Sequence, residues 1–234
     1  MGGVEDLKRE AGIRACQFVQ DGMRLGLGTG STVRYTILEI GRMVSEGGFE
    51  VVGVPTSEAT RELAESLGIP LIPISEAGRL DLTIDGADEF DPRFSLIKGG
   101  GGALTREKEV ALLSDSMIVV ADDRKKVEVL GEFDLPIEVK PGYWSDVSTA
   151  ISSMCEVRAS LRGGELAPYT TDNGGYILDC EFGPTITKPG DLEGKLLSIE
   201  GVVDVGLFVG LCDAVVMATD SGVETIVNPV GRLS

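Results

Sequence analysis

The sequence predicts an α/β protein with a doubly wound, mostly parallel sheet and a small inserted α+β domain of ferredoxin-like pattern. In the first half of the chain, short apolar runs typical of strands alternate with helical segments of about ten to fifteen residues. After residue 130 the pattern changes to short, mainly antiparallel strands among two helices. Glycine-rich or acidic loops follow several of the early strands. Because doubly wound sheets bind ligands beyond the carboxyl ends of their strands, we expect a functional site at that edge.

The length and hydrophobicity of the chain fit a globular protein. Its 234 residues leave room for one large domain, or for a domain with a small insert. Hydrophobic residues make up 42% of the chain, yet no apolar run approaches the roughly 20 residues of a membrane span. The opening sequence MGGVEDLKRE lacks the basic and apolar regions of a signal peptide. We therefore expect a cytoplasmic protein.

The charge balance narrows the classes of partner. A formal net charge of −17 argues against nucleic acids and anionic membranes, because both require a positive face. The excess of 38 acidic over 21 basic residues fits either a salt-rich or an ordinary cytoplasm. Local lysines can still attract an anionic substrate.

The absence of histidine restricts the chemistry. Proton transfer near neutral pH must fall to carboxylates, lysine or cysteine, and histidine-based metal sites and triads are excluded. The four cysteines are widely scattered and form no CxxC pair, so neither a zinc site nor a disulfide framework is indicated. We expect buried free thiols at Cys16, Cys155, Cys180 and Cys212.

Hydrophobic spacing predicts the elements of the first half. Glu5–Gln20 has apolar residues at helical spacing and ends at the turn Asp21-Gly22. Further strands are expected at Met23–Leu27, Phe49–Val54, Ile69–Ile74, Leu80–Ile84 and Met117–Ala121, and further helices at Tyr35–Val44, Thr56–Leu67 and Ala103–Ser114.

A glycine-rich turn between the first strand and the second helix indicates a phosphate site. Its backbone N–H groups and hydroxyls lie at a helix N-terminus, where a phosphate is stabilised. A Walker A loop would need a lysine that is missing here, and the dinucleotide fingerprint would need a further glycine. Two interpretations remain: a monophosphate site on a small substrate, and a tight turn with Ser31 or Thr32 as N-cap. The cradle would consist of Gly28, Thr29, Gly30, Ser31 and Thr32.

The stretch DGADEFDPRFSLIKGGGGALTREKE, residues 85–109, has the composition of an active site. Carboxylates at Asp85 and Asp88 follow a predicted strand, and a short apolar run then leads to Lys98 and four glycines. Glycines permit positive φ and let a ligand approach bare backbone N–H groups. Glu107 follows in the first turn of a helix, while we expect Glu89 and Glu109 to be solvated neighbours. A solvated acidic turn is the alternative; an EF-hand is excluded because apolar residues occupy ligand positions.

The second half contains the predicted insert. Elements are expected at Leu135–Val139 (strand), Ser145–Cys155 (helix), Glu156–Arg162 and Tyr176–Phe182 (extended), Leu192–Ser198 (helix) and Val202–Phe208 (strand). The sequence TDNGG at 171–175 is a hairpin signal. Ala214–Ala218 and Val223–Val227 would return the chain to the main sheet. The expected domains are therefore 1–130 with 207–234, and 131–206.

These motifs together resemble the type A family of ribose-5-phosphate isomerases over nearly the whole chain. The resemblance rests on GLGTGST (26–32), TSEAT (56–60), DGADE (85–89), KGGGGALTREK (98–108), ADDRKKV (121–127), LPIEV (135–139) and TDNGG (171–175). The family motif usually reads KGGGAAL, so Gly102 departs from it, and we expect the departure to loosen the loop without affecting its backbone donors.

The resemblance implies a Rossmann-like domain with an α+β lid or oligomerisation domain, a homodimer or homotetramer, and no metal or organic cofactor. It implies interconversion of ribose 5-phosphate and ribulose 5-phosphate in the pentose phosphate pathway. Glu107 would move a proton between C2 and C1 through a cis-enediolate, with Asp85, Asp88 and Lys98 contacting the sugar oxygens. The other implied substrate-binding residues are Thr29, Gly30, Ser31, Thr32, Gly86, Ala87, Gly99, Gly100, Gly101, Lys125 and Lys8.

Two rival interpretations remain open. Another enzyme of the same superfold, such as a sugar-phosphate deaminase, a lactonase or a CoA transferase, would share the fold without the full motif set. A phosphosugar-sensing module would keep the phosphate loop and lose the catalytic acids, whereas this chain retains them and has no helix-turn-helix extension or basic face.

Overall fold

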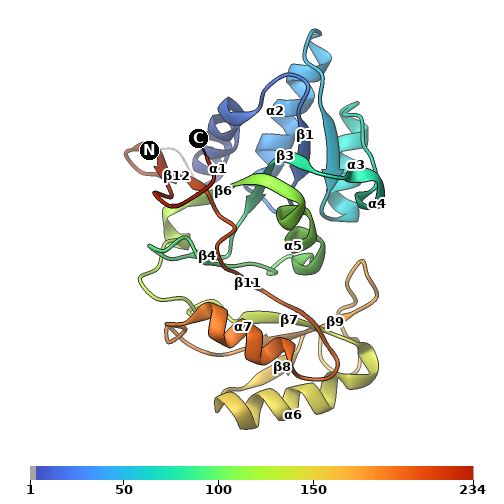
Figure 1. The fold of residues 1–234 in the computed structure, drawn as a ribbon, viewed down its shortest axis with the longest axis vertical. Coiled ribbons are helices and arrows are strands. Elements are labelled where there is room, and N and C mark those ends of the chain that lie inside the picture. The colour runs from blue at the N-terminus through green and yellow to red at the C-terminus, as the bar shows by residue number, and fades with distance from the viewer. Residues whose placement is uncertain (1–3, 234) are drawn as a thin grey trace. The chain divides into compact units, whose positions relative to one another are not determined.

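The computed structural model describes residues 4–233, which form two compact units (Figure 1). The first comprises Met1–Ala87, Arg106–Lys125 and Gly210–Ser234, and the second comprises Asp88–Thr105 and Lys126–Val209. The second unit therefore includes a segment of the predicted catalytic stretch. The domain boundaries expected from the sequence, at residues 130 and 206, stay predictions.

The first unit contains a six-stranded sheet in the order β13-β12-β6-β3-β1-β2. All neighbouring strands are parallel except β12 and β13, which form an antiparallel hairpin. The strands are β1 (Arg24–Leu27), β2 (Val52–Pro55), β3 (Leu80–Gly86), β6 (Ser114–Asp122), β12 (Ala214–Thr219) and β13 (Gly222–Val227). The predicted mostly parallel α/β sheet is confirmed.

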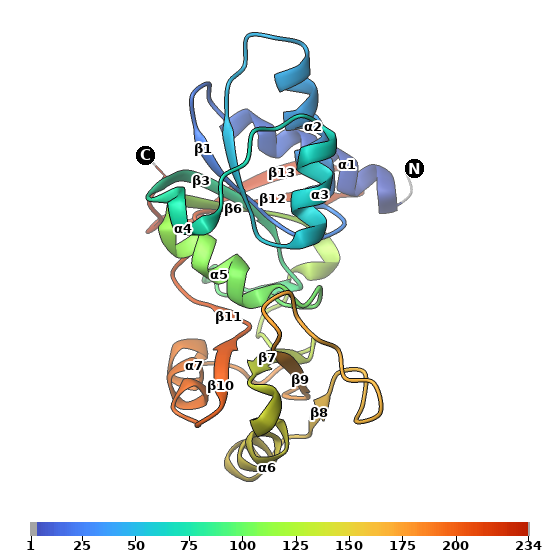
Figure 2. The same cartoon turned by 90° about the vertical axis from the view of Figure 1, so that its right-hand side faces the viewer.

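Helices cover both faces of this sheet (Figure 2). The bounds are α1 (Val4–Ala15, extended by the 3-10 turn Cys16–Phe18), α2 (Val33–Ser45), α3 (Glu58–Ser66), α4 (Ile74–Ala77) and α5 (Leu104–Leu113). Residues of α1, α2 and α3 form the larger core with one face of the sheet. Val110 of α5 and Ala77 of α4 pack in a second cluster with residues of β2 and β3. This two-sided cover is the doubly wound arrangement, and it leaves the carboxyl ends of the parallel strands for the loops.

The strand expected at Ile69–Ile74 is wrong. That segment makes only an isolated bridge between Gly53 and Leu71, and the helix α4 begins at Ile74. Pro70 and Pro73 lack the backbone N–H that a continuous ladder requires. The backbone therefore bonds to Gly53 on either side of Leu71, through Pro70 O at 2.8 Å and Ile72 N at 3.0 Å, and then leaves the sheet.

The second unit contains an antiparallel sheet in the order β10-β7-β9-β8. Its elements follow the βαββαβ order of a ferredoxin-like unit, as predicted: β7 (Leu135–Val139), α6 (Trp144–Cys155), β8 (Ala159–Leu161), β9 (Tyr176–Cys180), α7 (Pro189–Leu197) and β10 (Val202–Val205). A smaller sheet contains β4 (Glu89–Phe90), β5 (Leu96–Ile97) and β11 (Leu207–Phe208). The core of the unit is formed by side chains from both helices and both sheets.

The single strand expected at Val202–Phe208 is divided at Gly206 between the two sheets of this unit. The Gly206 N–H donates to Pro136 O at 2.7 Å, and its carbonyl accepts from Lys98 N at 2.8 Å. A Cβ at this position would lie 2.3 Å from the carbonyl oxygen of Lys98, so only glycine permits this approach. The prediction missed the division because strand propensity does not show such a backbone contact.

Across residues 4–233, none of the helices combines the length and the hydrophobicity needed to cross a membrane.

The buried carboxylate of Asp213 ties the end of the first unit to its sheet. Asp213 accepts hydrogen bonds from Met117 N at 2.7 Å and from Arg232 Nη2 at 2.9 Å. We expect Asp213→Ala to lower the free energy of unfolding by about 2–3 kcal/mol, because a buried backbone donor loses its partner. Urea denaturation measures this. The matched control is Asp220→Ala in the exposed β12–β13 turn, with an expected effect of less than about 0.5 kcal/mol; equal losses would contradict the anchoring role.

Candidate active site

The residues expected to form the site are distributed over both compact units. The first unit contains Lys8, Thr29–Thr32, Asp85–Ala87, Glu107 and Lys125, and the second contains Asp88 and Lys98–Gly101.

In the first unit, the structure brings the glycine-rich turn onto Asp85. The Asp85 side chain is fully buried at the end of β3. Its Oδ1 accepts hydrogen bonds from Thr29 N at 2.9 Å and from Gly86 N at 2.7 Å. A Cβ on Gly28 would lie 2.2 Å from the same oxygen. The glycine at position 28 is therefore what allows the turn to fix the orientation of this carboxylate.

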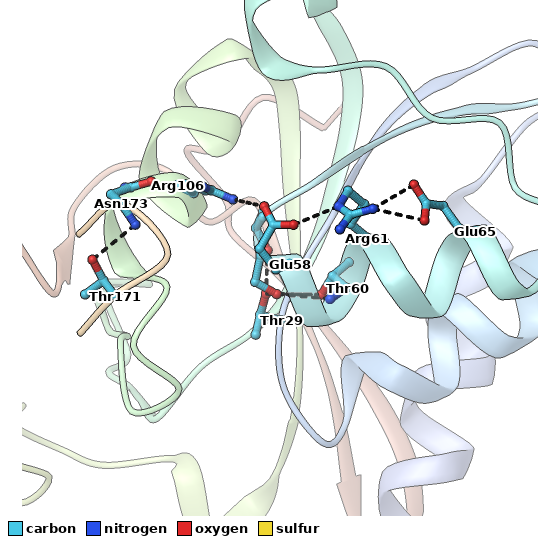
Figure 3. A network of polar contacts seen from close by, with 10 residues as sticks. Thr29, Glu58, Thr60, Arg61, Glu65, Arg106, Thr171 and Asn173 are labelled. Atoms are coloured by element: carbon cyan, nitrogen blue, oxygen red, sulfur yellow. Dashed lines mark hydrogen bonds and ion pairs between the residues drawn. The ribbon is translucent and has the colours of Figure 1, made fainter. Parts of the chain in front are cut away.

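A cluster of four hydroxyls, among them those of Thr29 and Thr60 in Figure 3, anchors the turn. Thr29 Oγ1 lies 2.7 Å from Thr56 Oγ1, 2.8 Å from Ser57 Oγ and 3.2 Å from Thr60 Oγ1. Thr60 Oγ1 also donates to Gly28 O at 2.8 Å. The side chain of Thr29 is thus engaged within the protein, and its predicted contact with a substrate stays a prediction. The sequence reasoning gave Thr56, Ser57 and Thr60 no role, although the TSEAT motif was a usable signal.

Ser31 and Thr32 are free of the capping role that was the alternative interpretation. Thr32 occupies the N-cap position of α2 but makes no side-chain capping bond. Among the residues that the structure describes, none is hydrogen bonded to either hydroxyl. Gly30 has φ +132° with open space around it, which exposes the turn. Two hydroxyls at a helix N-terminus therefore remain available to an anion.

Lys8 lies on α1 beside the first turn of α2. Its Nζ pairs with Glu5 Oε1 at 3.1 Å, and the other oxygen of Glu5 accepts from Tyr35 OH at 2.7 Å. Tyr35 N donates to Thr32 O at 3.1 Å. Glu5 thus links Lys8 to the turn that carries Thr32.

Lys125 ends the 3-10 turn Asp123–Lys125 that follows β6. The Arg124 guanidinium bonds to Asp122 and holds the pKa of that carboxyl below its usual range. This pair fixes the turn at the carboxyl end of β6, and Lys125 is half-buried there.

Glu107 is buried in the first turn of α5, with 4% of its surface exposed. A chain of charged side chains holds the neighbouring residue, Arg106 (Figure 3). Arg106 Nη1 pairs with Glu58 Oε1 at 2.9 Å, and Arg61 Nε bonds the other oxygen of Glu58 at 2.7 Å. Arg106 first, and then Arg61, lower the pKa of Glu58. This network fixes the first turn of α5 against α3, and a carboxylate in that turn is favoured by the helix dipole.

In the second unit, the structure brings Asp88 to the glycine loop after Lys98. Asp88 N donates to Ile97 O at 2.9 Å, and Asp88 Oδ2 accepts from Gly100 N at 2.7 Å. Lys98 is 2% exposed, and its Nζ lies 5.4 Å from the centre of the Phe208 ring. A buried ammonium beside an aromatic face is stabilised by a cation–π interaction. Lys98 is thus held at a defined place within the same unit as Asp88.

The side chain of Tyr169 fills the space beside Gly102. Gly102 has φ +79°, and a Cβ there would lie 2.3 Å from the hydroxyl oxygen of Tyr169. The looser loop expected from this departure stays a prediction. The departure from the family motif makes room for the aromatic ring.

The expectation that Glu89 is solvated is wrong. Glu89 is 3% exposed and accepts hydrogen bonds from Gly131 N, at 2.7 Å, and from Phe133 N. It is a structural carboxylate whose partners lie more than forty residues away along the chain, which local sequence cannot show. Glu109 is exposed, as expected.

The cysteines are free, and three are buried while Cys155 is half-buried. Burial raises the pKa of the Cys16 thiol to about 12, so it is unreactive at neutral pH. Within the part of the chain that the structure describes, no group of three or more acidic or cysteine side chains is arranged to hold a metal ion.

We expect Gly28→Ala to lower the free energy of unfolding by about 1–3 kcal/mol, because the new methyl group would overlap the Asp85 carboxylate. Thermal unfolding monitored by circular dichroism measures the change. The matched control is Gly194→Ala in α7, where a Cβ would meet nothing within 4 Å and helix propensity favours alanine by about 1 kcal/mol. A Gly28→Ala variant as stable as the wild type would show that the turn can move away from Asp85.

Known proteins match this chain over almost its whole length. The family model described as ribose 5-phosphate isomerase A (phosphoriboisomerase A) matches residues 52–222. The ribose-5-phosphate isomerase A of Rhodopseudomonas palustris (strain HaA2) is 49% identical over 228 residues, which cover 95% of this chain and 97% of that protein. The solved ribose 5-phosphate isomerase A of Methanocaldococcus jannaschii is 39% identical with a TM-score of 0.90, covering 96% of this chain and 100% of that one. A D-ribose-5-phosphate isomerase solved in complex with phospho-erythronic acid is also 39% identical, with a TM-score of 0.93, covering 97% of this chain and 100% of that one. The chain therefore belongs to the ribose 5-phosphate isomerase A family.

Proposed function

We propose that this protein is an aldose–ketose isomerase that interconverts D-ribose 5-phosphate and D-ribulose 5-phosphate in the non-oxidative pentose phosphate pathway. The observation that carries the proposal is family membership at 49% identity over 95% of the chain. A relative solved with phospho-erythronic acid, a phosphorylated sugar acid, supports a phosphosugar as the ligand.

The reaction requires a base that removes a proton from C2 and returns it to C1. As the C2–H bond breaks, its electron pair forms the C1–C2 double bond of a cis-enediolate, and the carbonyl oxygen at C1 becomes an oxyanion. A proton then moves from the C2 hydroxyl to the oxyanion at C1, and return of the abstracted proton to C1 leaves the carbonyl at C2. One carboxylate can perform both proton transfers, and we assign them to Glu107. Its burial supports this role, because a base shielded from water retains the proton it has taken.

The remaining acids and the ammonium have supporting roles. Lys98 and the N–H groups of the glycine loop stabilise the oxyanion, where preorganised donors are most effective. Asp85 and Asp88 exchange hydroxyl protons during ring opening and enediol formation. The fixed orientations of these two carboxylates, each held by backbone N–H groups within its own unit, support that assignment.

The phosphate group is assigned to the start of α2. The available hydroxyls of Ser31 and Thr32 supply donors, and Lys8 and Lys125 supply positive charge. This cationic complement lets an acidic protein bind an anionic substrate. The proposed reaction uses no metal and no organic cofactor.

The proposal includes self-association into a dimer or tetramer. The second unit, which is proposed to serve as lid and oligomerisation domain, exposes large apolar side chains at Met154, Leu166, Leu197, Val203 and Val209. Light scattering coupled to size-exclusion chromatography determines the state; a monomer at micromolar concentration would contradict this part of the proposal.

A coupled assay for ribulose 5-phosphate formed from ribose 5-phosphate tests the function. It is performed with excess EDTA present throughout. Turnover under these conditions supports a metal-independent isomerase. No turnover, with or without added divalent cations, would overturn the proposed reaction, and turnover that requires a cation would overturn the roles given to the carboxylates.

We expect Glu107→Gln to reduce kcat by about 10² to 10⁴-fold, because the variant keeps the shape of the side chain and removes its basicity. Binding of ribose 5-phosphate and the thermal stability should change little. Steady-state kinetics and calorimetry measure the two effects. Glu109→Gln, on the exposed face of the same helix, is the matched control and should retain wild-type kcat. If Glu107→Gln retained more than about a tenth of kcat, the base would be another residue.

We expect the double variant Ser31→Ala, Thr32→Ala to raise KM by at least about tenfold, because two hydroxyl donors to a charged group are lost. The reacting end of the sugar is untouched, so kcat should change less than KM. Neither hydroxyl caps α2, so stability should be unaffected. Ser66→Ala, at the exposed end of α3, is the control. An unchanged KM would place the phosphate elsewhere.

A further inference from the structure

Three successive carbonyls of the glycine loop are held by one segment of the second unit. Arg162 Nη1 donates to Gly99 O at 3.0 Å and to Gly100 O at 3.2 Å. Tyr169 OH donates to Gly101 O at 3.3 Å. A run of glycines has more conformational freedom than any other sequence, so its backbone needs such contacts to adopt one conformation.

The Arg162 guanidinium is itself fixed in place. Its Nε and Nη2 bond the two oxygens of Asp179 on β9, at 2.9 Å and 2.5 Å. Its backbone N–H donates to Ile177 O at 2.9 Å, which attaches Arg162 to the same strand. The guanidinium carbon also lies 5.7 Å from the centre of the Tyr169 ring. This two-point pairing leaves Nη1 directed at the loop, which a lysine ammonium could not reproduce.

Fixing a carbonyl also fixes the N–H group of the same peptide. The described backbone contains no cis peptide bond, and in a trans peptide the C=O and N–H groups point in opposite directions. Because Arg162 holds Gly100 O, the N–H of Gly101 points away from the guanidinium. Gly100 N is bonded to Asp88 and Gly102 N to Gly99 O. Gly101 N, by contrast, donates to no residue between 4 and 233, and Gly101 is exposed.

We infer that Arg162 is a positioning residue that, together with Asp179 and Tyr169, aims the Gly101 N–H at the oxyanion of the enediolate. This inference rests on the proposed isomerase function. Gly102 contributes by lacking a Cβ, since any side chain there would displace the Tyr169 ring that holds Gly101 O. Arg162 and Tyr169, which hold the carbonyls of the loop, thus lie some sixty positions away from it along the chain.

Arg162→Met is the principal test, and Arg158→Met is its matched control. Arg158 lies in the same unit and pairs with Glu181 at 3.3 Å, but it is exposed, and among the described residues it forms no hydrogen bond or ion pair with the loop. Kinetics with ribose 5-phosphate provide the first measurement. We expect Arg162→Met to reduce kcat by about 10- to 100-fold, the effect of a catalytic donor misplaced by about 1 Å. KM should stay within about threefold, because the phosphate contacts are intact.

Hydrogen–deuterium exchange of the free enzyme provides a measurement that does not depend on turnover. Gly100 N and Gly102 N are hydrogen bonded, so the peptide that contains the glycine loop should be protected in the wild type and in Arg158→Met. It should exchange faster in Arg162→Met. Arg162→Lys keeps the charge without the paired geometry, so we expect it to restore neither kcat nor protection. If Arg162→Met does not fold, Asp179→Asn, which releases the guanidinium, is measured in its place, with both effects expected in smaller degree.

Failure of the proposed function and failure of the role given to Arg162 would give different results. A wild-type enzyme without isomerase activity would overturn the proposed function and this inference with it. An active wild type whose Arg162→Met variant keeps kcat within about twofold, or keeps the wild-type exchange of the loop, would overturn the inference alone. Full rescue by Arg162→Lys would also overturn it, because charge and not direction would then be the contribution of Arg162.

Discussion

The first unit depends on backbone approaches that only glycine allows. A Cβ on Gly26 would lie 2.0 Å from Thr83 Oγ1, and one on Gly28 would lie 2.2 Å from Asp85 Oδ1. These two positions let β1 and the turn after it lie directly against β3. Because the turn is so close, the N–H of Thr29 reaches the Asp85 carboxylate and the hydroxyl of Thr29 reaches the hydroxyl cluster at the start of α3. The position of the turn that we propose to bind the phosphate, and the orientation of Asp85, thus follow from one constraint on side-chain volume.

In the second unit the glycines have the opposite effect. The backbone of the glycine loop has so much conformational freedom that the loop cannot define a site by itself. Polar side chains from distant segments hold the loop: Asp88 on one N–H, Arg162 on two carbonyls and Tyr169 on a third. In the same unit, Glu138 accepts hydrogen bonds from Thr105 and Thr171, which ties Thr105 to the turn of the TDNGG motif. Order in this loop is therefore supplied by side chains that need not meet a substrate.

The lack of histidine is consistent with a site in which carboxylates and a lysine are held in place by the two units. In the proposed reaction, carboxylates perform the proton transfers and an ammonium stabilises the oxyanion, provided that each is held in a fixed orientation. The structure supplies that orientation by different means: backbone N–H groups for Asp85 and Asp88, an aromatic ring for Lys98, and a neighbouring network of ion pairs for the turn that carries Glu107. The rival sensing module would have no need of this arrangement.

The sequence by itself determined the alternation of strands and helices, the parallel sheet, the ferredoxin-like insert and the family, because these depend on periodic hydrophobicity and on contiguous motifs. It also placed the candidate acids and the glycine turns, since each lies within one short segment. Contacts between distant segments were decided only by the tertiary structure. The strand expected at Ile69–Ile74 is reduced to one bridge with Gly53, because two prolines lack the backbone N–H that a longer ladder needs. The strand expected at Val202–Phe208 is divided by the backbone contacts of Gly206. Glu89 was buried by partners some forty residues away, and Arg162 found the glycine loop some sixty residues away. In these hydrogen bonds a polar side chain pairs with a backbone group that every residue has. The fold decides which groups meet, so the pairing leaves no local pattern in the sequence.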